Sequence, residues 1–228
     1  MGSAPVTSEG AFRRARRPEQ KQQRYEAILD AAHALALRDG VAAVTLTAIA
    51  AEVGMHKSAL LKYFGTREEI FLRLAESDWS AWADGLVADL GRGPVDEQQL
   101  VEVLTRSLVE RPLICQMLTT HSALTFEREV PIEAARRSKS AAMQAAGEVA
   151  DAVHAAFPAL DPGASRELVI ATGLMAASLW QVAHPAPVVA ATFDRSPEER
   201  GFPQAAPIHF AEALARFIHI HLAGLRHV

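Results

Sequence analysis

Side chains that could bind a polyanion gather in one short stretch of the sequence, residues 45–64. Lys57 and Lys62 carry ammonium groups, which are attracted to phosphates. His56 and Ser58 can each donate or accept hydrogen bonds. This set of groups is suited to ion pairing and hydrogen bonding with a charged surface.

Residue sets that would support catalysis or a metal are missing from the sequence. His219 and His221 are two residues apart and lack the i, i+4 spacing of a helical metal pair. Cys115 and His121 are six apart and have no third candidate ligand nearby. There is no Gly-x-Ser-x-Gly nucleophile turn and no phosphate loop after a strand. We therefore predict neither enzymatic activity nor a metal or other cofactor.

Two short helices are expected to position the polyanion-binding side chains. They run over about Thr47–Val53 and Lys57–Phe64, and Gly54 between them supplies the positive φ that a tight turn needs. Leu60 and Phe64 are four residues apart and face inward, which turns the lysine side outward. A helix displayed in this way fits the major groove of DNA. An ordinary helical hairpin with a solvated lysine face has the same spacing.

The rest of the chain has helical periodicity and no sustained strand alternation, so we predict an all-α fold. Five prolines between His184 and Pro207 indicate a long loop there. About nine helices are expected: Gln22–Asp39, Thr47–Val53, Lys57–Phe64, Thr66–Leu90, Asp96–Val109, Pro112–Phe126, Pro131–Phe157, Pro162–Ala183 and Pro207–Ala223.

Composition indicates a globular protein of the cytoplasm. The 228 residues are 50% hydrophobic and 22% charged, and there is one cysteine, Cys115, so no internal disulfide can form. We find no apolar run long enough to span a membrane and no secretory signal at the start.

The charge is unevenly distributed. Residues 1–65 hold nine Lys and Arg against six Asp and Glu, whereas residues 66–228 hold fourteen against twenty-one. A basic head on an acidic body favours contact of the head with a polyanion. Four arginines before Pro18 belong to an expected flexible arm, residues 1–20, which is either a solvated tail or an arm on phosphates or in a minor groove.

Residues 22–74 resemble the N-terminal domain of TetR-type (TetR/AcrR) transcriptional regulators. The motifs that carry the resemblance are Ile28-Leu29-Asp30-Ala31-Ala32, Gly40, Thr45 to Ala50, Gly54, Leu60, Tyr63-Phe64 and Thr66-Arg67-Glu68-Glu69-Ile70-Phe71. The resemblance implies a DNA-binding domain over 21–80, with its motif at 45–64, followed by a helical regulatory and dimerisation domain over 81–228.

The resemblance also implies which residues contact DNA. Arg67 matches a position that holds backbone phosphate, and Lys57 and Lys62 match groove-facing positions. His56 replaces a frequent serine, and Leu61 replaces a frequent aromatic residue, so Leu61 is expected to touch a thymine methyl. The full expected set is Thr45, Thr47, Met55, His56, Lys57, Ser58, Ala59, Leu61, Lys62, Tyr63 and Arg67.

In this family the last two helices pair with those of a second copy, so a homodimer is expected. The dimer candidates are Ala171, Ala177, Phe210, Leu214, Phe217 and His221. An apolar pocket for a small molecule is expected in the body, and its candidates are Trp79, Trp82, Cys115, Met117, His121, Phe126, Met143 and Trp180. For each of these residues the alternative is a place in the helical core.

The function that these inferences imply is regulation of transcription at a double-stranded, palindromic operator. The expected protein is a homodimeric repressor that a small hydrophobic ligand releases, without contact with a membrane. Two alternatives on the same fold stay open, a transcriptional activator and an architectural DNA-binding protein that needs no ligand.

Overall fold

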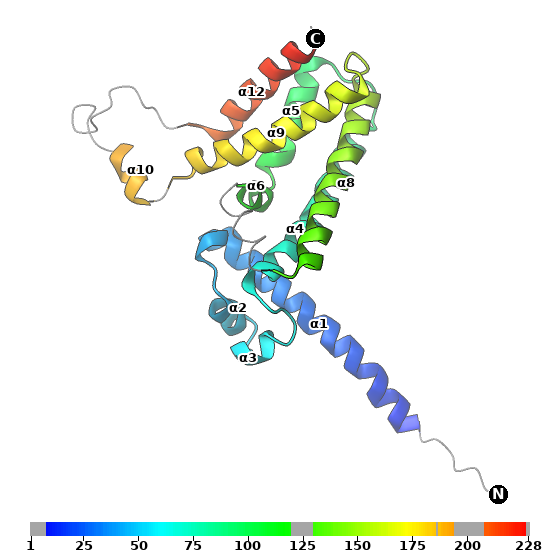
Figure 1. Ribbon diagram of the computed structural model, residues 1–228, viewed down its shortest axis with the longest axis vertical. Helices are drawn as coiled ribbons and strands as arrows, with labels where there is room; N and C mark the ends of the chain where they lie inside the picture. Colours follow the sequence, from blue (N-terminus) through cyan, green and yellow to red (C-terminus); the bar gives the residue numbers. More distant parts are fainter. Residues whose placement is uncertain (1–7, 120–129, 186, 194–207, 227–228) are drawn as a thin grey trace, which may run out of the picture. The chain divides into compact units, whose positions relative to one another are not determined.

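The computed structural model describes residues 8–119, 130–185, 187–193 and 208–226, with only the backbone described for 8–17, 187, 192 and 193. All regular elements in these ranges are helices (Figure 1). They are α1 (Ser8–Asp39), the short 3-10 helix η1 (Val41–Ala43), α2 (Leu46–Glu52), α3 (Lys57–Leu60), α4 (Arg67–Leu90), α5 (Glu97–Val109), α6 (Pro112–Leu118), α8 (Ile132–Ala156), α9 (Pro162–Ala183), α10 (Pro187–Phe193) and α12 (Phe210–Leu225). The expected all-α fold is confirmed.

Several elements differ from the expectation, and the described ranges hold ten α-helices rather than about nine. α1 begins at Ser8, so residues 8–20 of the expected flexible arm are helical, and α1 continues through Pro18 although proline donates no backbone hydrogen bond. α10 lies inside the expected proline-rich loop. The expected helix Pro112–Phe126 is helical to Leu118, and its last part lies outside the described residues.

The chain divides into two compact units between Phe71 and Leu72, within α4. We expected the boundary nine residues later, at 80/81. The earlier division agrees with the packing, because Trp79 of α4, which lies before the expected boundary, already packs against the core of the second unit. Among the described residues, no helix combines the length and the low polarity needed to cross a bilayer.

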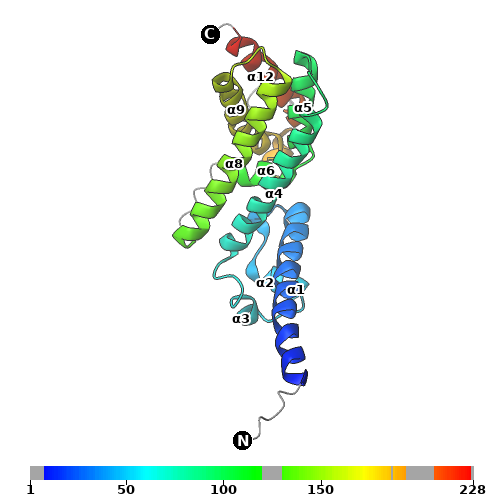
Figure 2. The same cartoon turned by 90° about the vertical axis from the view of Figure 1, so that its right-hand side faces the viewer.

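The first unit is built on one apolar stripe of α1. Ile28, Ala32 and Leu35 recur at helical spacing and are buried. η1 and α2 pack against α1, and α3 packs against α2 (Figure 2). Gly40 ends α1 with a φ of 83°, a conformation that glycine adopts without the steric cost of a Cβ.

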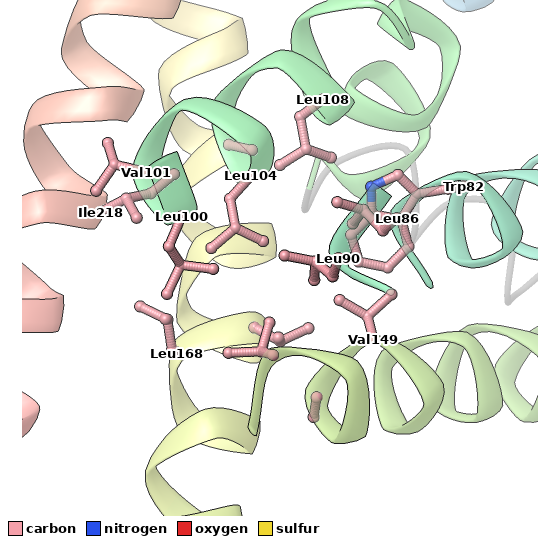
Figure 3. Close-up of a cluster of buried hydrophobic side chains, with 14 of the residues drawn as sticks. Trp82, Leu86, Leu90, Leu100, Val101, Leu104, Leu108, Val149, Leu168 and Ile218 are labelled. Carbon is pink, nitrogen blue, oxygen red and sulfur yellow. The ribbon is translucent and has the colours of Figure 1, made fainter. Parts of the chain in front are cut away.

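The second unit has a core of leucines and valines. α9 packs against α6, α8 and α12, and α12 also packs against α5. Figure 3 shows side chains from five helices meeting in this core: Trp82, Leu86 and Leu90 of α4, Leu100, Leu104 and Leu108 of α5, Val149 of α8, Leu168 of α9 and Ile218 of α12. Since a fully buried leucine contributes roughly 1.5–3 kcal/mol, burial of these side chains is the main source of the unit's stability.

Several helix starts follow directly from capping chemistry. The Asp96 carboxylate accepts from the Gln99 amide at 2.8 Å, and the Gln99 side chain accepts from the Asp96 amide at 2.9 Å. Thr66 accepts from the Glu69 amide at 3.1 Å as its spacing predicts, but the Glu69 carboxylate accepts from the amide of Gly65 rather than that of Thr66.

Candidate nucleic-acid interface

The start of α2 is fixed by Thr45. Its hydroxyl oxygen accepts a hydrogen bond from the Ala48 amide at 3.1 Å, which satisfies one of the free amides at the helix start. Ile49 and Ala50 of α2 are buried against the rest of the unit, while Thr45 and Thr47 are exposed. The two threonines therefore lie on the outside of the unit, where the sequence predicts them.

The turn between α2 and α3 is closed by two backbone hydrogen bonds. The Met55 amide donates to the Ala50 carbonyl at 2.8 Å, and the Gly54 amide donates to the Ala51 carbonyl at 3.1 Å. This pair of bonds is a Schellman motif, and it requires a positive φ, which Gly54 supplies at 66°. The turn therefore sets the direction in which α3 leaves α2.

α3 is shorter than the expected helix Lys57–Phe64. The regular helix ends at Leu60, and hydrogen bonds of the tighter i→i+3 type carry the chain on, from the Tyr63 amide to the Leu60 carbonyl at 2.8 Å. Leu60 and Phe64 are buried as expected, and the Phe64 ring stacks on Tyr25 of α1 with centroids 4.8 Å apart. These two side chains hold the segment to the unit, so its other side faces outward.

Most of the expected DNA-contacting residues are exposed in the first unit. His56 stands at the start of α3 with its Nδ1 3.3 Å from the Ser58 hydroxyl oxygen. Met55, Ala59 and Tyr63 are half-buried. The exposed members of the set are Thr45, Thr47, His56, Lys57, Ser58, Leu61 and Lys62. The surface therefore offers hydroxyls, an imidazole and two ammonium groups together with the apolar Leu61, 42% exposed.

A groove beside the turn adds residues that the motif analysis missed. Gln20, Gln23 and Arg24 of α1 line this groove together with Gly54 and Met55. Arg24 is exposed and lines this groove opposite the turn that precedes α3. The signal that could have found it was the positive charge of the first 65 residues, because Arg24 lies outside the helix-turn-helix itself.

Arg67, which is expected to contact phosphate, has several partners within the first unit. Its guanidinium donates to the backbone carbonyls of Val41 and Val44 and pairs with Glu68 at 2.9 Å. The guanidinium also lies 4.9 Å from the centre of the Phe71 ring. These contacts direct the side chain to the segment before α2, and a phosphate contact of Arg67 stays a prediction. Arg67 holds that segment to the start of α4.

Arg67→Met is expected to lower the stability of the first unit by about 1–3 kcal/mol, because two carbonyls of buried residues lose their donor. Thermal unfolding followed by far-UV circular dichroism measures the change. Fluorescence would miss it, since all three tryptophans lie in the second unit. Arg38→Met is the matched control, because Arg38 is an exposed residue that pairs with its neighbour Asp39. If the salt slope of DNA binding is instead smaller by about one in the Arg67→Met variant, Arg67 contacts a phosphate.

The expected pocket residues separate into two groups. Trp79, Met117 and Met143 line a cavity in the second unit. Trp82, Cys115 and Trp180 are not on its wall, and His121 and Phe126 lie outside the described residues. Trp82 is in the core, where its indole donates to the Ser107 hydroxyl at 3.1 Å.

Cys115 and Trp180 are also packed against the core. Burial raises the pKa of the Cys115 thiol to about 12, and the thiol donates to the Leu108 carbonyl at 3.4 Å. The Trp180 ring stacks on His184 with centroids 3.8 Å apart. Both were expected in a pocket because a buried aromatic or sulfur side chain looks the same in sequence whether it lines a cavity or fills a core. Among the described residues, no three His, Cys, Asp or Glu side chains gather as metal ligands would.

Three of the expected dimer residues are buried inside the chain itself. Ala177, Phe210 and Leu214 are at most 9% exposed, so they have no surface to offer a second copy. Ala171, Phe217 and His221 are half-buried. All six were expected at an interface because small and aromatic residues allow α9 and α12 to pack closely. Within one chain α9 and α12 already pack against each other, and three of the six residues are buried there.

A Schellman turn that joins two short helices, with lysines on the outer side of the second, defines a helix-turn-helix DNA-binding unit. Residues 28–74 match the family model of bacterial regulatory proteins of the tetR family. Residues 76–228 match the model of the tetracyclin repressor-like C-terminal domain. The chain belongs to the TetR family of transcriptional regulators.

Solved structures with the same fold include two fatty-acid regulators. FadR from Bacillus halodurans is 15% identical with a TM-score of 0.55, and the match covers 89% of this chain and 96% of that one. FadR from Thermus thermophilus, a TetR-family repressor in complex with lauroyl-CoA, is 16% identical with a TM-score of 0.53, over 88% and 94% of the two chains. At these identities the likeness shows a shared fold. No curated protein matches the chain.

Proposed function

We propose that this protein is a homodimeric repressor that binds a palindromic operator and is released from it by a small molecule. The observation that carries the DNA-binding part is the outward display of Lys57, Ser58 and Lys62 around a segment anchored by buried Leu60. Lysine can reach guanine acceptors in the major groove as well as phosphates, and serine can bond to several bases. Acting on chromosomal DNA, the protein works in the cytoplasm.

The dimer is proposed on the outer faces of α9 and α12, which lie side by side in Figure 1. Ile170 and Leu174 recur at helical spacing on α9, where Leu174 is 65% exposed. Ile220 on α12 is 58% exposed, and Phe217 is half-buried one turn before it. Such apolar side chains need a partner, and a symmetric dimer also doubles the length of DNA that the protein reads.

Release from DNA is proposed to begin at the cavity of the second unit. Leu72, Ala75 and Trp79 of α4 form part of its wall, and α4 also begins in the first unit. A ligand that binds one position of α4 better than another shifts the population toward that position. Because α4 is continuous, such a shift reaches the DNA-binding unit through the helix itself.

Selection from a random pool of double-stranded DNA tests the proposed function. The expected result is enrichment of one palindrome, which binds far more tightly than a scrambled duplex at the same salt concentration. Equal binding to all duplexes would contradict the regulator, since phosphate contacts alone carry no sequence information. Fusion of the selected palindrome to a reporter promoter then measures repression directly.

A further inference from the structure

The guanidinium of Arg111 joins two helices of the second unit. Its Nη2 donates to the backbone carbonyl of Ala81 in α4 at 3.2 Å, and its Nη1 donates to the backbone carbonyl of Ser107 in α5 at 3.2 Å. The planar fork of an arginine holds two such acceptors in a fixed geometry, which the ammonium group of a lysine does not. Arg111 therefore ties α4 to the end of α5 by directional bonds to main-chain atoms.

Gly85 leaves the Ala81 carbonyl open to this bond. A carbonyl inside a helix accepts from the amide four residues later and keeps a second lone pair for another donor. A Cβ at position 85 would lie 3.1 Å from Nη2 of Arg111, which is tighter than ordinary van der Waals contact. Glycine inside a helix is less favourable than alanine, so the access that it gives to Arg111 explains its place within α4.

Ser107 connects this contact to a second one on α4. Its hydroxyl accepts a hydrogen bond at 3.1 Å from the indole of Trp82, which Figure 3 shows in the core, and donates to the Leu104 carbonyl at 2.8 Å. Residues 81 and 82 of α4 are thus bonded to Arg111 and Ser107, respectively. Apolar burial has no preferred direction, whereas hydrogen bonds require a defined geometry. These bonds therefore fix the position of α4 along α5.

Arg111 also begins the helix that lines the cavity of the second unit. It is the N-cap residue of α6, and Met117 and Leu118 at the other end of α6 are on the cavity wall. Because α6 has seven residues, the cavity wall and Arg111 are separated by about two helical turns. A displacement of α6 therefore acts on the bond between Arg111 and Ala81.

We propose that Arg111 is a positioning residue that holds α4 in the place required for operator binding, in a latch made of Arg111, Gly85 and Ser107. This inference rests on the proposed function, because it names the residue that regulates DNA binding. α4 is continuous from Arg67 to Leu90 and begins in the first unit. If α4 takes several positions, a smaller fraction of molecules matches both half-sites, and the apparent affinity falls by that fraction.

Operator binding by full-length Arg111→Met tests the latch. We expect the affinity to fall by about 10-fold, because fewer molecules hold α4 in the competent position. Arg111→Lys is expected to recover part of this loss, since an ammonium group can donate to one of the two carbonyls without holding both. Val153→Ala is the control, because it removes buried methyl groups from α8 and lowers stability without touching the latch. A merely structural role would lower the melting temperature in both variants and leave operator affinity unchanged in both.

A double-mutant cycle with Gly85→Ala gives a second measurement that needs no DNA. In the Arg111→Met background, alanine only improves α4, and the melting temperature is expected to rise by about 2–4 °C. With Arg111 present, the added Cβ presses on the guanidinium, and this gain is expected to be lost. Tryptophan fluorescence follows the second unit, which holds all three tryptophans. Equal effects of Gly85→Ala in the two backgrounds would overturn the latch.

The two measurements separate the latch from the proposed function. Weaker operator binding by Arg111→Met, with unchanged binding by Val153→Ala, supports the inference. Specific operator binding that is equal or stronger in Arg111→Met overturns the positioning role and leaves the repressor standing. Absence of any sequence-specific binding overturns the repressor, and unequal effects of Gly85→Ala in the two backgrounds then still support a latch that fixes α4.

Discussion

Lys62→Ala is expected to weaken binding to the operator by ~1–3 kcal/mol for each subunit. Lys62 is exposed, lies just beyond α3 and shares the outer surface with Lys57 and Ser58. Its loss removes a cation from the side that faces DNA, while buried Leu60 and Phe64 keep the segment in place. Fluorescence anisotropy with the selected palindrome, at several salt concentrations, measures both the affinity and its salt slope.

The salt slope shows which kind of contact Lys62 makes. If it meets phosphate, the affinity falls equally for operator and scrambled DNA, and the slope decreases by about one per subunit. If it meets a base edge, the operator loses more than the scrambled duplex. Arg92→Ala is the matched control, because Arg92 is 78% exposed and lies in the second unit. An unchanged affinity for Lys62→Ala would remove this residue from the interface.

The helix-turn-helix could be predicted from sequence because its determinants are local. The Thr45 hydroxyl accepts a hydrogen bond from the amide of Ala48, three residues further along the chain. The turn at Gly54 is closed by hydrogen bonds within the six residues 50–55. Leu60 and Phe64 identify the inner side by their spacing alone. Each of these features depends on residues less than two helical turns apart, so no knowledge of the remaining chain is needed.

Arg67 shows where local reasoning stops. Its backbone partners, Val41 and Val44, precede it by 26 and 23 residues, and no spacing rule connects positions so far apart. The family resemblance made Arg67 a phosphate contact, because an arginine at the start of a helix looks free in sequence. Only the folded first unit, in which the start of α4 lies beside Val41 and Val44, shows that carbonyl oxygens of the chain itself accept its hydrogen bonds.

The body of the protein was harder to predict for a related reason. α9 and α12 are apolar on more than one side, so their composition does not tell which side meets the core. Leu214 is fully buried, whereas Leu174 is 65% exposed, and both are leucines on helices that were expected to dimerise. Cys115 and Met117 are two residues apart on α6, yet only Met117 reaches the cavity. Which residue faces a cavity depends on how the helices cross, and that is a property of the whole unit.

The double substitution Leu174→Asp with Ile220→Asp is expected to convert the proposed dimer into monomers. Leu174 and Ile220 are 65% and 58% exposed, so the change leaves the core of each chain intact. In a dimer the same two side chains would be buried against a second copy, where unpaired carboxylates cost several kcal/mol each. Sedimentation velocity measures the mass in solution, and circular dichroism confirms that the helices remain.

Loss of the dimer is expected to reduce operator affinity by roughly 10²–10⁴-fold, because a monomer contacts one half-site and loses the effective concentration of the second. Ile132→Asp is the control, since Ile132 is an 80% exposed residue of α8 away from the proposed interface. It should leave both mass and affinity unchanged. If the Leu174→Asp, Ile220→Asp protein still sediments as a dimer, the pairing surface lies elsewhere. If it is a monomer that binds the palindrome with undiminished affinity, then one helix-turn-helix recognises the site alone. That result would contradict the proposal that two subunits bind the two halves of a palindromic operator.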